Sequence, residues 1–178
     1  MVRKQVNPTT VTGGASQVLE GVRDRLGMTT NMTKVMAASP SVLSGYLDFS
    51  LALANGVLDA KFREQIALVV SIANQSEALL KMHSAIAKKI GMSEDEIRAS
   101  QQCHSDDAKK TAALKFVSEL VVWRGQVGRK IVRGMRNAGY GDAEIVEIAA
   151  NAALVTLANC FECLASGLGD LAEPPGAA

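Results

Sequence analysis

A histidine and a serine seven residues apart are the side chains of this sequence best suited to chemistry. His83 can accept or donate a proton near neutral pH, and a carboxylate partner would orient its ring. The alternative is a half-buried structural histidine hydrogen-bonded to Glu64. Ser76, Leu79 and His83 are spaced i, i+3 and i+7, which places them on one stripe of a helix. Ser76 is a poor nucleophile for His83 to activate, because seven residues span about 10 Å along a helix axis. We therefore expect Ser76 to fill space.

Lys81 offers a second chemistry within the same segment, where it stands between Leu80 and Met82. An ammonium group that is desolvated in an apolar pocket can lose its proton and form a Schiff base. On a helical wheel, however, Lys81 points about 140° away from Ser76 at about 100° per residue. This direction favours an ordinary solvated lysine, with Schiff-base chemistry as the alternative.

A Cys-x-x-Cys sequence encloses a glutamate near the C-terminus. Cys160 and Cys163 lie deep inside a predicted helix, away from the N-terminal amides that activate such thiols, so we expect two small buried hydrophobic residues. Zinc would need four ligands, and the remaining donors, Cys103 and His104, come from another loop, so we expect no metal site. Glu162 is either a general base in an apolar setting, or it faces solvent or forms a salt bridge across a subunit contact.

The segments that must position these groups are predicted to be helices. Apolar residues recur at helical spacing from Ala15 onward, and no strand-like alternation extends beyond a few residues. Asp59 is expected to cap one helix, Ser93 to begin a capping box with Glu96, and Asp142 to open the longest helix. The sequence therefore predicts an all-α fold of about eight helices, with an arm over 1–14, one helical domain over 15–172 and a tail over 173–178.

Composition limits the classes of function. The 178 residues are 48% hydrophobic but 4% aromatic, and this aliphatic bias suits helix packing. A formal net charge of +1 gives no electrostatic case for nucleic acid or an anionic membrane. We expect no membrane span, because apolar runs fall short of about 20 residues. Three cysteines and a polar N-terminus predict a cytoplasmic protein without a disulfide framework.

Four segments place a glutamate and a histidine at set distances on this helical background: residues 58–68, 74–83, 83–97 and 137–154. In this order they resemble the AhpD-like alkylhydroperoxidases of the carboxymuconolactone decarboxylase superfamily, over roughly residues 15–172. In redox-active members the glutamate is followed twelve residues later by Cys-x-x-Cys, and a histidine stands four residues beyond the second cysteine. Glu64, Ser76, Leu79 and His83 fall at those positions. The resemblance implies an AhpD-like helical fold, a trimer or hexamer, a pocket near subunit contacts, and proton relay by the glutamate and histidine.

The two changed positions remove the chemistry that the resemblance implies. Ser76 cannot be oxidised to a sulfenic acid, and Leu79 cannot resolve one into a disulfide. Similar proteins often carry an aromatic residue at the position of Ala78 and a histidine at the position of Asn151, and they differ again around residues 159–163. The expected pocket is lined by Ser76, Leu79, Leu80, Asn151 and Cys160. This distribution suggests a site rebuilt by divergence or by engineering.

Three functions follow as hypotheses, none of which requires a cofactor. In the first, Glu64 and His83 transfer protons on a small organic substrate, and thiol peroxidase activity is absent. In the second, the chain is a non-enzymatic or engineered oligomeric scaffold. In the third, an artificial active site uses Glu162 as the base or Lys81 as the amine.

Overall fold

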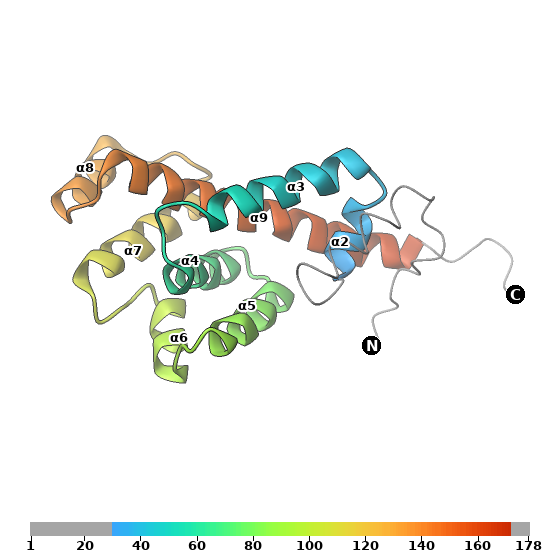
Figure 1. Cartoon of the computed structure of the whole chain (residues 1–178), viewed down its shortest axis with the longest axis horizontal. Helices are drawn as coiled ribbons and strands as arrows, with labels where there is room; N and C mark the ends of the chain where they lie inside the picture. The colour runs from blue at the N-terminus through green and yellow to red at the C-terminus, as the bar shows by residue number, and fades with distance from the viewer. Residues whose placement is uncertain (1–29, 172–178) are drawn as a thin grey trace, which may run out of the picture. The chain divides into compact units, whose positions relative to one another are not determined.

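The computed structural model describes residues 30–171, and over that range it contains eight helices and no strand (Figure 1). The helices are α2 (Asn31–Met36), α3 (Pro40–Ala54), α4 (Ala60–Ala73), α5 (Glu77–Lys89), α6 (Glu94–Gln101), α7 (Ala108–Val122), α8 (Arg129–Asn137) and α9 (Asp142–Leu171). The all-α prediction is confirmed. The predicted arm, the helix expected from Ala15 and the tail lie outside the described residues.

The chain forms two compact units. One contains α2, α3 up to Phe49, and α9 from Cys160 onward. The other runs from Ser50 to Asn159 and includes α4 to α8. Most of the residues that the sequence singled out for chemistry belong to this second unit, so it is the one that positions the candidate site.

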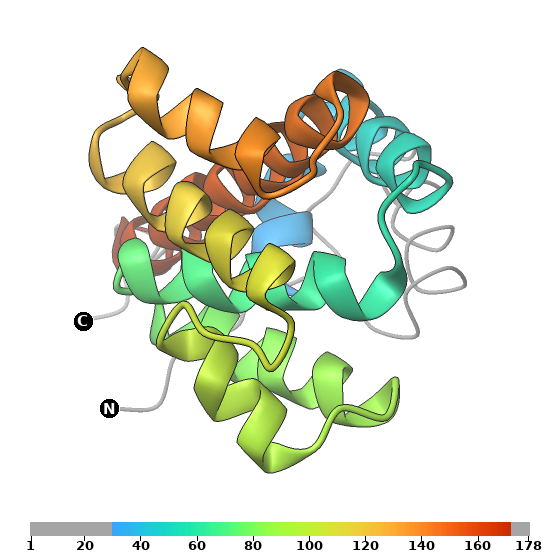
Figure 2. The same cartoon turned by 90° about the vertical axis from the view of Figure 1, so that its left-hand side faces the viewer.

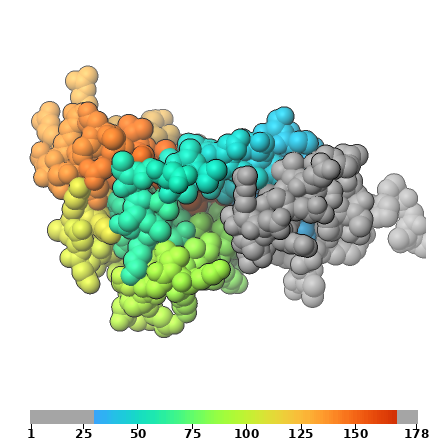
Figure 3. All heavy atoms as spheres, viewed as in Figure 1, coloured from blue at the N-terminus to red at the C-terminus, as the bar shows by residue number. Residues whose placement is uncertain are grey.

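Helix α4 is the centre of the second unit. It packs against α5, α6 and α7, and in Figure 2 it crosses the middle of the view with α7 above it and α5 and α6 below. Every residue from Gln65 to Ser71 is buried, so this helix has no solvated face along two turns. Leu68 is fully buried in a cluster with Ala87 of α5, Ile97 of α6 and Met92 between them. The α5–α6 segment forms the green part of the surface in Figure 3.

Local signals define where the helices begin. Asp59 caps α4, with its Oδ1 accepting from the Phe62 amide at 2.8 Å. Ser93 and Glu96 form the predicted capping box at the start of α6, and Asp142 opens the longest helix as expected. In α3, apolar spacing does not coincide with burial throughout, because Leu51 is 52% exposed while Leu43 and Leu53 are buried.

Helix α9 carries an exposed apolar face. Val146, Leu157, Leu164 and Leu168 are exposed large apolar residues on it. Cys160 and Cys163 are also exposed, so the prediction that they are buried is wrong for the single chain. Residues Asp142–Leu168 have the length and composition of a membrane-crossing helix, with a mean hydropathy of 1.5, although the sequence predicted no such segment. A helix whose apolar face packs against another protein passes the same test.

Candidate active site around Glu64 and His83

A tight turn joins α4 to α5 and aligns the two helices that carry the candidate pair. The amide of Ser76 donates to the Ser71 carbonyl at 2.9 Å, and the amide of Gln75 donates to the Ile72 carbonyl at 3.0 Å. These two bonds are the Schellman pattern that ends a helix. The pattern requires a left-handed residue, and Gln75 fills that position with φ of 55°. Ser76 then begins α5 at once as its N-cap.

Glu64 of α4 and His83 of α5 form a direct hydrogen bond. His83 Nδ1 lies 2.9 Å from Glu64 Oε2. The His83 side chain is 12% exposed and the Glu64 side chain 18%, so the pair is largely shielded from solvent but still accessible to it. This contact spans 19 residues of sequence and depends on the α4–α5 packing around Leu68.

The bond to Glu64 sets the proton positions on the neutral ring. An ionised carboxylate only accepts hydrogen bonds, so the facing Nδ1 carries the proton and donates it. The lone pair then lies on Nε2, which makes no hydrogen bond to any described residue. An imidazole held in one tautomer, with its other nitrogen open, has the arrangement of a general base.

Ser76 and Leu79 have structural roles at the start of α5. The Ser76 side chain accepts from the Leu79 amide at 3.4 Å, as an N-cap does. Leu79 is buried and Leu80 is half-buried. None of the three supplies an ionisable group, so the chemistry of this segment rests on His83 and Glu64.

Two other predicted site residues of this unit have partners of their own. Lys81 is 81% exposed on its side chain and lies 3.8 Å from Glu77, so it is a solvated lysine without the desolvation that an amine nucleophile needs. Asn151 is buried, and its Nδ2 donates to the Glu147 carbonyl one turn earlier in α9. Cys160 is exposed and Glu162 half-buried, and both belong to the other compact unit.

Among residues 30–171, no group of three or more histidine, cysteine, aspartate or glutamate side chains is arranged to hold a metal ion.

Sequence reasoning missed two polar residues. Gln65 is buried with its Oε1 unpaired, and the buried Nδ2 of Asn74, at the end of α4, is likewise unpaired. A signal was available for Gln65, since it is a polar residue directly before the apolar run 66–70 of a helix that is buried all round. The signal for Asn74 was weaker, because asparagine is common at helix ends.

Comparison with known proteins agrees with this architecture. The model of the carboxymuconolactone decarboxylase family matches residues 40–119, from the start of α3 into α7. The chain is similar to an AhpD-core, peroxidase-related protein from Ralstonia eutropha JMP134, with 21% identity, a TM-score of 0.75, and coverage of 90% of this chain and 87% of that one. A peroxidase-related protein from Silicibacter sp. TM1040 gives 20% identity and a TM-score of 0.71, covering 99% and 91%.

A third similar structure is a cysteine-to-alanine variant of the debrominase Bmp8 in complex with 2,3,4-tribromopyrrole. It shares 17% identity at a TM-score of 0.75 and covers 97% of this chain and 98% of that one. No curated protein matches the sequence. The family match over residues 40–119 and the shared helical fold confirm the resemblance to AhpD-like proteins and the carboxymuconolactone decarboxylase family stated above.

Proposed function

We propose that this protein is an acid/base enzyme that moves a proton on a small organic substrate, with His83 as the base and Glu64 as the residue that orients it. The observation that carries the proposal is the 2.9 Å bond between His83 Nδ1 and Glu64 Oε2, which leaves Nε2 open. A substrate with an acidic C–H group next to a carbonyl is the matching class, because a neutral imidazole can remove such a proton.

The proposal excludes thiol chemistry by the family route. We propose that Ser76 and Leu79 occupy the positions of the redox cysteine pair. The chain's three cysteines, Cys103, Cys160 and Cys163, stand elsewhere in the sequence. Superfamily members that are carboxymuconolactone decarboxylases, as their name states, indicate that this frame also supports chemistry at carbon. The debrominase named above acts on a brominated compound, which is consistent with a pocket for small organic molecules.

The test is deuterium uptake from D₂O into small carbonyl compounds with acidic C–H groups, followed by proton NMR. The wild-type protein should accelerate exchange at the carbon next to the carbonyl. His83→Ala should lower the rate by roughly 10² to 10⁴, the usual contribution of a positioned acid or base. Lys81→Ala, which removes an exposed amine on the same helix, is the matched control and should retain the rate. Equal rates for wild type and His83→Ala would remove the proposal. Loss in Lys81→Ala alone would favour the amine alternative.

We also propose that the protein forms a homo-oligomer through α9. Its exposed apolar residues recur at positions 146, 153, 157, 160 and 164, in steps of seven, four, three and four, which is the spacing of a helix–helix seam. Light scattering should give a multiple of 18.8 kDa for the wild-type protein. Leu157→Glu should reduce that mass, whereas Val57→Glu, an exposed apolar residue outside α9, should not. A monomeric wild type would refute the proposal.

A further inference from the structure

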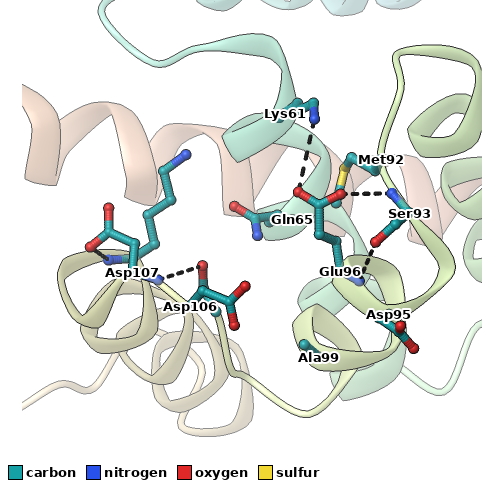
Figure 4. A pocket seen from close by; sticks show the side chains of 11 residues that line it. Lys61, Gln65, Met92, Ser93, Asp95, Glu96, Ala99, Asp106 and Asp107 are labelled. Atoms are coloured by element: carbon teal, nitrogen blue, oxygen red, sulfur yellow. Dashed lines mark hydrogen bonds and ion pairs between the residues drawn. The ribbon is translucent and has the colours of Figure 1, made fainter.

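A cavity of about 550 Å³ lies between α4, α6 and the start of α7, and the active-site pair does not line it (Figure 4). Its lining residues are Lys61, Gln65, Met92, Ser93, Asp95, Glu96, Ala99, Ser105, Asp106, Asp107 and Lys110. Neither Glu64 nor His83 is among them. The volume falls in the range of small-molecule sites, about 300–1,000 Å³.

Gln65 gives this cavity an unpaired polar group. Its residue is 6% exposed, and its Oε1 has no hydrogen-bond partner. Figure 4 shows the Gln65 amide beside the Glu96 carboxylate, which is paired with Lys61. A buried amide without a partner costs about 1–3 kcal/mol, so native proteins keep few of them. Rotation about the last torsion exchanges the oxygen and nitrogen of the amide at little cost, so the oxygen can turn toward a ligand.

The charges around the cavity favour a cation. Lys61 lies 3.8 Å from Glu96, so its charge is already matched within the rim. Lys110 lies 3.3 Å from Asp59, a carboxylate that does not line the cavity. The carboxylate of Asp106 makes no hydrogen bond or ion pair with any described residue.

Two further carboxylates add to the negative charge. Asp95 pairs with Arg98, and the Asp107 carboxylate accepts from the amides at the start of α7. Both helix N-termini at this cavity are thus already capped by side chains of the protein, Ser93 with Glu96 on α6 and Asp107 on α7. An anion would meet occupied amides and four carboxylates, whereas a cation meets the unpaired Asp106.

An apolar surface completes the site. Met92 is buried beneath the cavity, and Ala99 lines it from α6. A ligand with an alkyl part can cover these groups while its charged end stays among the carboxylates. Contact with this apolar surface would not stabilise a bare metal ion.

We propose that this cavity binds an organic amine, whose ammonium group donates hydrogen bonds to the Asp106 carboxylate and the Gln65 carbonyl while its carbon chain packs on Met92. The site is separate from the Glu64–His83 pair and goes beyond the proton-transfer function. It gives the buried, unpaired Oε1 of Gln65 a partner.

The experiment is an NMR titration of the whole protein with n-butylammonium, read from the side-chain amide signals of Gln65. Saturable shifts of these signals are expected. Tetramethylammonium has the same charge but no N–H donor and should bind about tenfold more weakly, and butyrate should not bind. Saturation by tetramethylammonium at the same concentration would overturn recognition by hydrogen bonds. No saturable shift with n-butylammonium would overturn the site.

Matched variants locate the binding. Asp106→Asn and Gln65→Met should each weaken n-butylammonium binding about tenfold or more. The aspartate is exposed, so its variant is expected to fold as the wild type does. Glu119→Gln removes an exposed carboxylate of α7 that does not line the cavity, and it should leave the affinity unchanged. Equal weakening by Asp106→Asn and Glu119→Gln would reduce the effect to general charge attraction and contradict the proposal.

Discussion

Glu64 and Gln65 are consecutive residues of α4, but their side chains are in opposite situations. Glu64 reaches across to α5 and accepts a hydrogen bond from His83. Gln65 lies against the cavity of α6 and α7 with its Oε1 unpaired. A step of about 100° around one helix separates the two directions. A paired group orients a neighbour for chemistry, whereas an unpaired one has a hydrogen bond left for a ligand.

The comparison also shows what the two sites share. Both depend on α4 holding its place against α5 and α6, and Leu68 lies in the cluster that joins these three helices. Glu64 and Gln65 therefore have different partners but depend on the same packing of α4 against α5 and α6. Substitutions can separate these contributions, since some should affect both sites and others one.

Leu68→Ala should have the largest effect, because it removes packing beneath both sites. Leu68 is fully buried, and a leucine-to-alanine change at such a position costs about 2–5 kcal/mol of stability. Denaturant unfolding measures the loss, and both proton exchange and amine binding should weaken. If one site kept its full activity in a destabilised variant, the shared support would be refuted.

Gln65→Met and Glu64→Met should change stability in opposite directions. The first removes a buried unpaired amide and should stabilise the fold by about 1–3 kcal/mol, without lowering the proton-exchange rate. The second leaves His83 Nδ1 without its acceptor and should destabilise the fold by a similar amount. Denaturant midpoints of the two variants check this. Midpoint shifts of the same sign in both variants would show that pairing does not decide how these two side chains contribute to stability.

Gln75→Gly tests the turn that positions His83 but not the amine cavity. The left-handed φ of Gln75 is unfavourable for a side chain with a Cβ atom, and glycine relieves that strain. We expect the free energy of unfolding, measured by thermal denaturation, to rise by about 0.5–1 kcal/mol, with amine binding unchanged. A loss of stability would show that the Gln75 side chain contributes more than its backbone strain costs.

Glu144→Gln should give the smallest effect, because it lies outside both sites. The backbone hydrogen bond from Gly141, together with Lys109 at 3.0 Å, holds the pKa of Glu144 below its usual value. Its contribution to stability is therefore present at neutral pH and is lost as the pH falls through the lowered pKa. The variant should have a slightly lower melting temperature at neutral pH, and its melting temperature should change less as the pH falls into the acid range. An unchanged acid profile would contradict this role.

The helices could be predicted because their signals are local. Asp59 and Ser93 satisfy backbone amides within three residues of their own positions, and both caps are as expected. Exposure of Leu51, Cys160 and Cys163 could not be predicted in the same way. Apolar spacing indicates which face of a helix is apolar, but it does not say whether that face packs against the same chain or another one.

The candidate site was predictable where a resemblance supplied the spacing. Glu64 and His83 are 19 residues apart, and their contact requires the turn at Gln75 and the packing of Leu68, which helical periodicity alone does not give. Gln65 was missed because an unpaired group is recognised only after the partners of its neighbours are known. Lys81 was assigned to solvent by its direction on the wheel, and its 81% exposure agrees with that interpretation.

The tautomer of His83 is the most direct test of the central claim, and it can be read from long-range proton–nitrogen NMR correlations of the ring. Measured at a pH where the ring is neutral, the wild-type protein should carry its proton on Nδ1 and present Nε2 as the unprotonated nitrogen, while Glu64→Met should show a mixture. A wild-type ring protonated on Nε2, or an identical pattern in Glu64→Met, would contradict the assignment of His83 as an oriented base.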